Sequence, residues 1–177
     1  MVQVVVDTKR LKRRISKMKQ SFNPRVLMQV IGMRQLSWIN ANFETDGKGV
    51  GGWEPLSPNT IAARRHGGSK PLQDTGALKR SFHILELSEG KVVVGSLIRY
   101  AAAHNEGVPA SRINPILPKR KKALSFVTAN GRVIVKGVYH HPGIPKRRIL
   151  PTQIEAKNLA VQVLDALIKN LSKDKGQ

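Results

Sequence analysis

Phe82-His-Ile-Leu-Glu-Leu-Ser-Glu-Gly-Lys-Val-Val-Val-Gly-Ser96 is the stretch that decides the fold class of this chain. Two apolar runs, 82–87 and 91–96, flank Ser88-Glu89-Gly90, whose composition is that of a turn, so the stretch predicts a β-hairpin. A second hairpin is predicted where residues 124–128 and 132–136 flank Asn130-Gly131. That dipeptide tolerates the positive φ angles of a tight turn. The two hairpins together predict a small antiparallel sheet.

Helices are predicted before, between and after these hairpins. Asn23 and Pro24 have the sequence of an N-cap and first helical position, and the helix they open extends to about Glu44. Its apolar residues cover more than one stripe, which indicates burial on several sides, and a neighbouring subunit is one candidate for the second side. Ser57-Pro58 repeats the cap signal for a short helix over 59–65, and residues 100–106 predict another.

The final helix has the clearest start signal. Thr152-Gln-Ile-Glu155 is a capping box, and apolar residues follow it at helical spacing to about residue 171. The order helix, helix, hairpin, hairpin, helix predicts an α+β fold. A long helix from the N-terminal half and the C-terminal helix should pack on the small antiparallel sheet.

The chain is divided here into a basic arm, residues 1–22, and a single α+β domain, residues 23–177. The arm starts with a strand-like run over 2–6 and continues as a helix that Thr8 can cap. Within the domain, the glycine-rich stretch 46–52 predicts a loop without regular structure, and a proline-rich connector spans 108–122. Both segments, near 45–52 and 108–122, are expected to be mobile and to become ordered on assembly.

Composition excludes several classes of protein. The 177 residues contain 31 Lys and Arg but 11 Asp and Glu, a formal charge of +20, and no cysteine. Disulfides, thiolate nucleophiles and zinc–thiolate or iron–sulfur sites are therefore excluded. No apolar run approaches the ~20 residues of a spanning helix, and nothing has the pattern of a signal peptide, so we expect a soluble intracellular product with no membrane partner.

Three motifs suggest chemistry that their context does not support. Asp74-Thr-Gly-Ala matches the short signature of aspartic proteases, but no apolar strand precedes it, so we expect Asp74 to cap a short helical turn. The loop 47–52 lacks the Ser or Thr and the preceding strand of a phosphate-binding loop. His104 and Glu106 with His140 and His141 lack the spacing of a metal site.

We therefore expect His140 and His141 to serve a turn and His104 to be a hydrogen-bonded structural residue. The sequence predicts no catalytic residue, no metal, no cofactor and no small-molecule substrate.

The basic residues form three clusters without compensating acids, so a polyanionic partner is expected. Phosphate backbones and an acidic protein face both fit, and the sequence does not choose between them. No aromatic residues are interleaved, so any contact with nucleic acid would be blind to base sequence. The clusters contain Lys9, Arg10, Lys12, Arg13, Arg14, Lys17 and Lys19; Arg112, Lys119, Arg120, Lys121 and Lys122; and Lys146, Arg147 and Arg148.

Four sequence blocks in fixed order resemble the phage virion morphogenesis family, the tail-completion proteins of Mu-like and related tailed phages. They are Trp53-Glu-Pro-Leu-Ser-Pro; Pro71-Leu-Gln-Asp-Thr-Gly-Ala-Leu-Lys-Arg-Ser81; Val92-Val-Val-Gly-Ser96 with Tyr100-Ala-Ala-Ala-His-Asn-Glu-Gly107; and His141-Pro-Gly-Ile-Pro-Lys-Arg-Arg-Ile-Leu-Pro151. The chain departs from the family pattern at Arg148-Ile149, where Pro-Phe is usual.

The resemblance implies a structural protein of the virion neck, assembled in the host cytoplasm. Such a protein closes the head-proximal end of the tail or joins tail to head, as a ring of about six subunits (a hexamer) around the DNA path. Its partners would be further copies, other neck and tail proteins, and double-stranded DNA in the channel. A tail-terminator ring subunit and a free, sequence-independent nucleic-acid-binding protein are the alternatives.

Two groups of residues are predicted to make these contacts. The interface candidates are Trp53, Tyr100, Arg112, Lys119, Arg120, Arg147 and Arg148. The candidates for DNA or an acidic partner are Lys9, Arg10, Lys12, Arg13, Arg14, Lys17, Lys19, Lys121 and Lys122.

Overall fold

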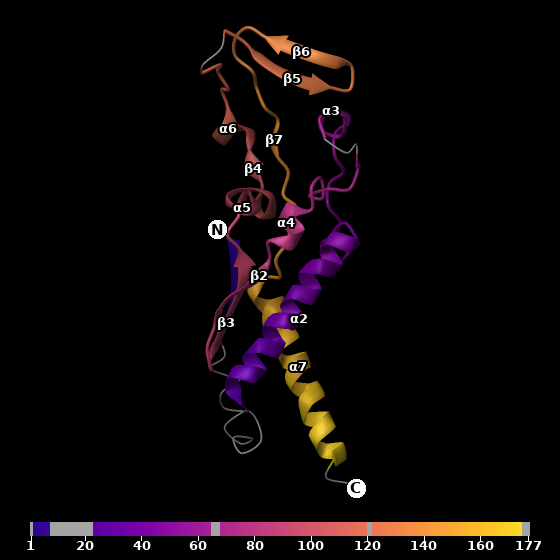
Figure 1. Ribbon diagram of the computed structural model, residues 1–177, viewed down its shortest axis with the longest axis vertical. Helices are drawn as coiled ribbons and strands as arrows, with labels where there is room; N and C mark the ends of the chain where they lie inside the picture. The colour runs from indigo at the N-terminus through magenta and orange to yellow at the C-terminus, as the bar shows by residue number, and fades with distance from the viewer. Residues whose placement is uncertain (1, 8–22, 65–67, 120–121, 175–177) are drawn as a thin grey trace. The chain divides into compact units, whose positions relative to one another are not determined.

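The computed structural model describes residues 2–7, 23–64, 68–119 and 122–174 (Figure 1). Helices and small antiparallel sheets make up the chain, which confirms the predicted α+β class. The sequence is treated above as one domain after residue 22, whereas the structure groups the chain into two compact units. Unit 1 contains Met1–Ala41, Ser81–Leu97 and Leu150–Gln177, and unit 2 contains Asn42–Arg80 and Ile98–Ile149. The predicted helix in the basic arm lies outside the described residues.

Unit 1 contains a three-stranded antiparallel sheet. The first predicted hairpin is confirmed as β2 (His83–Leu87) and β3 (Lys91–Ser96), with a bulge between Ile84 and Glu86. The strand-like run at the start of the chain is β1 (Val2–Asp7), which pairs with the other edge of β3, so the strand order is β1-β3-β2. Because β3 is central, its residues 92–96 are buried.

The long helix α2 (Pro24–Glu44) packs on this sheet, and its predicted start is confirmed. The Asn23 side-chain oxygen accepts a hydrogen bond from the Arg25 backbone N–H at 2.9 Å. Gly32 allows a close approach of helix to sheet, since a Cβ at this position would stand 2.8 Å from side-chain atoms of Ile84 and Val92.

The second long helix of unit 1 is α7 (Gln153–Asp174). Its capping box is confirmed: the Thr152 hydroxyl accepts from the Glu155 N–H at 3.2 Å, and the Glu155 carboxylate accepts from the Thr152 N–H at 2.8 Å. The buried side of α7 contacts β1 and carries Ala156, Leu159, Ala160, Val163 and Leu164.

Unit 2 is built from short elements connected by loops. Its helical turns are η1 (Lys48–Val50), α3 (Pro58–Ala62), α4 (Ala77–Arg80), α5 (Arg99–Glu106) and α6 (Ala110–Ile113). Its two ribbons pair β4 (Val108–Pro109) with β7 (Gly143–Ile144), and β5 (Leu124–Thr128) with β6 (Gly131–Val135).

The glycine-rich stretch was expected to lack regular structure and the connector to be mobile, and both contain short regular elements. Residues 46–52 form η1 between left-handed glycines, and the Gly52 N–H closes the loop by donating to the Gly47 carbonyl at 2.8 Å. The connector 108–122 includes β4 and α6. Local sequence propensity does not predict η1, because it depends on glycines with positive φ that allow a tight turn. It does not predict β4 either, because the partner strand β7 lies far along the chain. The expected mobility of both segments stays a prediction.

The second hairpin is confirmed, but its turn differs by one residue. Thr128 pairs with Gly131, so Ala129 and Asn130 form the turn, and only Gly131 has a positive φ, +105°. Side chains take up the turn's free N–H groups: the Thr128 hydroxyl accepts from Asn130 at 3.3 Å, and the Asn59 side chain accepts from Ala129 at 3.0 Å.

Candidate functional site

The centre of unit 2 is the buried side chain of Arg147, which is 5% exposed. Its Nε donates a 2.9 Å hydrogen bond to the Glu54 carbonyl, and its Nη2 donates a 3.3 Å bond to the Pro55 carbonyl. The Arg147 backbone N–H donates to the carbonyl of His104 at 2.8 Å. One residue therefore ties together three segments that lie far apart in the sequence. We call this arrangement the Arg147 hub.

Trp53 binds the residue that follows Arg147 in the chain. Its indole N–H donates to the Arg148 carbonyl at 2.9 Å, and its ring stands edge-on to Phe43 with centroids 5.2 Å apart. A Cβ at Gly47 would collide with the indole, so this glycine is needed for the loop to close over the ring. Trp53 is 7% exposed. A contact between its side chain and a partner, as predicted, would therefore require the loop 46–52 to move.

Sequence reasoning missed two asparagines whose side chains hold backbone segments of unit 2. The Asn105 side-chain oxygen accepts from the backbone N–H of Ile149 at 2.9 Å. Asn114 and His141 exchange two bonds: the Asn114 amide donates to the His141 carbonyl at 2.7 Å and accepts from its N–H at 2.6 Å. Asn105 lies within one of the sequence blocks that carry the family resemblance, whereas Asn114 lies between two of them, without a comparable signal.

A cavity of about 230 Å³ adjoins the hub. Two polar atoms buried beside it, Asp74 Oδ1 and His104 Nδ1, have no hydrogen-bond partner. The charged and polar side chains around the cavity are Arg64, Asp74, Thr75, Tyr100, His104 and Arg147.

Two sequence expectations are therefore wrong. Asp74 does not cap α4, because the Thr75 hydroxyl accepts from the Ala77 N–H, at 3.3 Å. The ring of His104 is not held through Nδ1 but lies edge-on to Tyr100, with centroids 6.0 Å apart. His141 serves a turn as predicted, since its Nδ1 accepts from the Gly143 N–H at 3.0 Å.

Burial sets the charge states around this cavity. Burial is the main cause that lowers the pKa of His104 below its ordinary value of 6.5, and the Arg147 charge lowers it further. Burial also lowers the pKa of Arg147, while Glu54 raises it and Arg64 lowers it. His104 is therefore uncharged at neutral pH, and the hub carries its positive charge on the arginines.

The lowered pKa of His104 predicts a loss of stability in acid. As the pH falls below 6.5, the unfolded chain takes up a proton at this site before the folded chain does, so stability present above 6.5 is lost on the way to the folded-state pKa. We expect the melting temperature to fall less between pH 7 and pH 5 in His104→Gln than in the native protein. The exposed His140→Gln is the control and should follow the native curve. Parallel curves for native protein and His104→Gln would contradict the prediction.

A second cavity, of about 550 Å³, lies on another side of the hub. Its lining combines Glu54, Glu106 and Lys146 with Pro109, Pro142 and Pro145. Within the described ranges, no three His, Cys, Asp or Glu side chains are grouped so that they could hold a metal ion. The arrangement around the hub supports a rigid structural centre, with hydrogen bonds that run mainly to backbone carbonyls.

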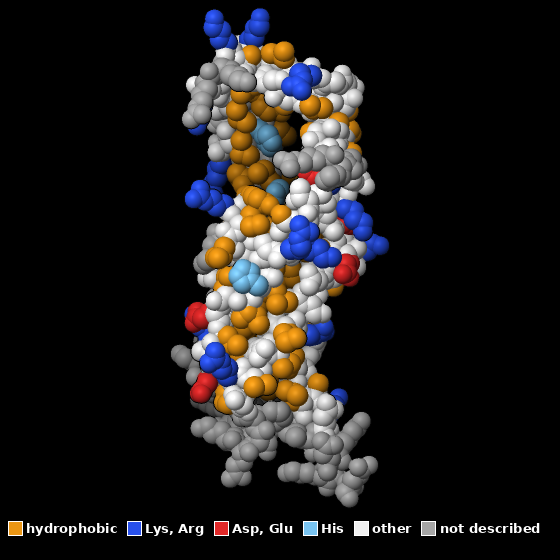
Figure 2. Space-filling view, viewed as in Figure 1, with side chains coloured by type: hydrophobic (Ala, Val, Ile, Leu, Met, Phe, Trp, Pro, Cys, Tyr) orange, Lys and Arg blue, Asp and Glu red, His pale blue; other side chains and the backbone are white. Residues whose placement is uncertain are grey.

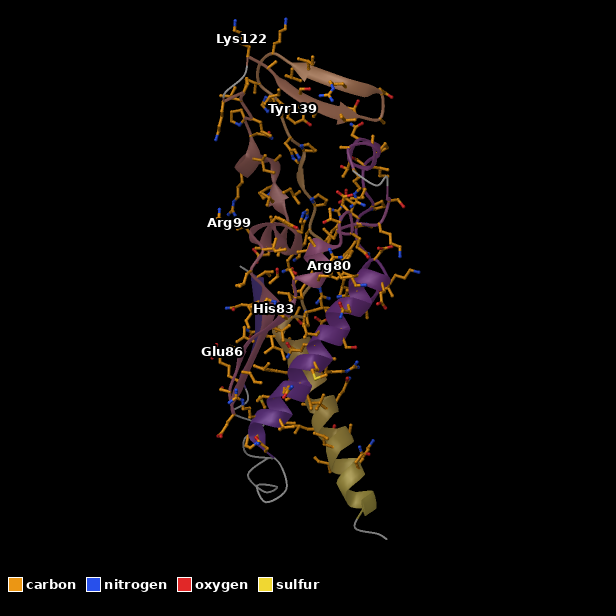
Figure 3. The ribbon with its side chains drawn as sticks, viewed as in Figure 1. Arg80, His83, Glu86, Arg99, Lys122 and Tyr139 are labelled. Carbon is orange, nitrogen blue, oxygen red and sulfur yellow. The ribbon has the colours of Figure 1, made fainter. Side chains whose placement is uncertain are left out.

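The predicted interface residues are distributed unevenly between interior and surface. Tyr100 is 48% exposed, and Arg112, Lys119 and Lys122 are exposed as well. Arg148 is half-buried and Arg147 is buried. Lys122 lies beside the β5–β6 hairpin, and Tyr139 lies against it with its ring 4.9 Å from that of Phe126 (Figure 3). Arg120, Lys121 and the cluster Lys9, Arg10, Lys12, Arg13, Arg14, Lys17 and Lys19 lie outside the described residues.

Among the side chains that the structure describes, unit 2 has the larger excess of positive charge. From residue 107 to residue 154 the chain has ten Lys and Arg and no acid. Among side chains that the structure describes, unit 2 has 14 Lys and Arg against five Asp and Glu, whereas unit 1 has five against four. Lys and Arg side chains stand out around the β5–β6 hairpin in the space-filling view (Figure 2). The described side chains of unit 2 therefore carry an excess of positive charge, and the cluster of residues 9–19 adds to the charge of unit 1.

The comparisons with known proteins agree with the sequence blocks. Residues 6–172 match the model of the phage virion morphogenesis family, and no curated protein or solved structure matches the chain. In the part of the chain that the structure describes, no helix combines the length and the hydropathy needed for a transmembrane span. The match covers nearly the whole chain, both units included, and the family points to a structural protein. The chain belongs to the phage virion morphogenesis family.

Proposed function

We propose that this protein completes the tail of a tailed phage in the virion neck, as a ring of copies around the DNA path that joins tail to head. The family supports a role in virion morphogenesis, and the charge of unit 2 supports docking on a polyanion. The observation that carries the finer proposal is the excess of 14 Lys and Arg over five acids among the described side chains of unit 2. The polyanion is an acidic neck protein or the DNA itself.

Electron microscopy of particles made by a phage that lacks this gene tests the proposal. Filled heads beside free tails of finished length are expected, and the gene supplied in trans should restore joined particles. Tails of uncontrolled length would instead indicate a tail-terminator subunit. Intact, infectious particles would remove the structural role and favour a free nucleic-acid-binding protein.

The charge of unit 2 makes a second prediction in the same complementation assay. We expect the double variant Lys119→Gln/Lys122→Gln to reduce the yield of joined particles, because both side chains are exposed in the acid-free stretch. The control Lys157→Gln/Lys169→Gln removes the same charge from exposed positions on α7 in unit 1 and should leave the yield unchanged.

The salt dependence of head–tail joining tests the same contact independently. Joining of purified heads and tails by the native protein should weaken as salt rises, since exposed charges are screened over about 8 Å at physiological ionic strength. Joining that is indifferent to salt, or equal losses in the two double variants, would contradict docking through unit 2.

A further inference from the structure

Strand β6 is exposed along almost its whole length. Its residues 131–134 are exposed and Val135 is half-buried. The side chains of Val133 and Ile134 are 37% and 62% exposed, and as neighbours in a strand they point to opposite faces. A strand with apolar side chains open to solvent on both faces is a template for pairing with another segment. The covering of β6 therefore needs an explanation.

The outer edge of β6 has no strand beside it in the described part of the chain. β5 and β6 form a two-stranded sheet, and helix α3 contacts β5, which lies between α3 and β6 (Figure 1). A two-stranded hairpin is only marginally stable by itself, and a third strand adds a ladder of backbone hydrogen bonds. The outer edge of β6 is therefore a place where an extended segment can add to the sheet.

The two faces of the hairpin differ in their side chains. Phe126 and Val133 are paired across the strands and share one face, on which the Phe126 ring lies 4.9 Å from that of Tyr139. Arg132 and Ile134 alternate with Val133 along β6, so they lie on the other face. A strand added at this edge would therefore meet Val133 on one face and both Arg132 and Ile134 on the other.

Charge selects the kind of segment that can add here. Arg132 precedes the apolar triplet 133–135 and Lys136 follows it, and both cations are exposed. The whole stretch 107–154 contains ten Lys and Arg and no acid. Like charges opposite each other in a strand pair are destabilising, whereas opposite charges are stabilising. The edge therefore disfavours β6 of a second copy and favours a strand with a carboxylate at each end of an apolar stretch.

Duplex DNA fits this surface less well than a polypeptide does. A two-stranded ribbon can enter the major groove, where it reads bases through hydrogen-bonding side chains and holds phosphates through cations. Val127, Val133 and Ile134 are exposed apolar side chains of the hairpin that make neither kind of contact. Their burial requires apolar groups on the partner, and a polypeptide supplies these together with carboxylates.

We infer that the outer edge of β6 binds an extended acidic segment of another protein, as a third strand of the hairpin. The inference rests on the proposed function for its biological setting and deepens it, because it identifies the polyanion as an acidic protein. Backbone hydrogen bonds along the edge and burial of the apolar triplet supply the affinity. Carboxylates near Arg132 and Lys136 supply the selectivity.

Binding of two short labelled peptides to the purified full chain, followed by fluorescence anisotropy, tests the inference. The acidic peptide is a run of valine and threonine with a glutamate at each end, and the basic peptide has lysine in place of each glutamate. The native protein should bind the acidic peptide at least about tenfold more tightly. Arg132→Glu/Lys136→Glu should abolish this preference, and circular dichroism checks that the variant is folded. The matched control Lys157→Glu/Lys169→Glu makes the same charge change at exposed positions on α7 and should keep the native preference.

Hydrogen exchange of the backbone amides separates strand addition from a loose attraction between charges. Amides of β6 should gain protection when the acidic peptide binds, because the added strand accepts hydrogen bonds from the edge. A duplex oligonucleotide is the second probe. The inference is overturned if the acidic peptide does not bind, or if it binds without protecting β6. Protection of β6 by the duplex but not by the peptide would overturn it in favour of DNA.

Failure of this inference is distinguishable from failure of the proposed function. If the acidic peptide does not bind while the gene-deleted phage makes unjoined heads and tails, the protein still completes the tail and docks through another surface. Intact, infectious particles from the gene-deleted phage overturn the proposed function whatever β6 binds.

Discussion

Replacing Arg147 with alanine is expected to lower the free energy of unfolding of unit 2 by about 3 kcal/mol. The substitution removes the donors that satisfy the Glu54 and Pro55 carbonyls and leaves a void at a 5% exposed position. The backbone bond from Arg147 to His104 survives in the variant, so the loss reports on the guanidinium and its packing.

Arg147→Lys gives a graded test of the same hub. A lysine keeps the charge and most of the stem but cannot place two donors in the planar geometry of a guanidinium. We expect a smaller loss than for alanine, with the remainder due to one unpaired carbonyl. The control is Lys146→Ala, an exposed neighbour whose loss should be within about 0.5 kcal/mol of the native protein.

The two tryptophans allow the units to be followed separately. Trp38 lies in unit 1 and Trp53 in unit 2, so urea unfolding monitored by fluorescence in a Trp38→Phe background reports on unit 2. If Arg147→Ala and Lys146→Ala unfold at the same urea concentration, the guanidinium is not what holds unit 2 together.

Gly95→Val is expected to have an effect of similar size in unit 1, about 3 kcal/mol. Gly95 lies in the central strand β3, opposite Gln3 of β1 and His83 of β2. A Cβ there would collide with the Val2 carbonyl oxygen and would stand 2.9 Å from the Gln3 Cα. These are backbone atoms that cannot rotate away, so β1 must shift or detach from the sheet.

Amide hydrogen exchange shows which residues lose protection in the variant. In Gly95→Val, the amides of residues 2–4 should lose protection, while those of unit 2 should keep theirs. Gly137→Ala is the control, because a Cβ at Gly137 meets nothing within 4 Å, and its stability should be native or slightly higher. Native protection of β1 in Gly95→Val would show that the strand tolerates a side chain here.

Elements whose signals are local were predicted well. The N-caps at Asn23 and Ser57, the capping box at Thr152 and the two hairpins all appear in the structure, because each depends on hydrogen bonds or torsion preferences within a few residues. The family resemblance also came from short sequence blocks, and the family model confirms it.

One error is local and the other arose from a distant contact. Asp74 has the right residue type for a cap, yet the hydroxyl of the neighbouring Thr75 accepts the hydrogen bond from the Ala77 N–H. Arg147 belongs to a cluster of consecutive basic residues, which predicts surface exposure. Its side chain is buried instead, because it donates hydrogen bonds to loop carbonyls more than ninety residues away in the sequence.

The sequence by itself determined the α+β class, the starts of the long helices and the family, and it predicts a polyanionic partner. The class and the helix starts follow from periodicity and capping chemistry, the family resemblance from four short sequence blocks, and the predicted partner from net charge. Only the tertiary structure decided that β1 completes the sheet of unit 1 and that Arg147 is a buried hub. The reason is physical: strand pairing and burial depend on which distant segments meet, and no local pattern of residues specifies that.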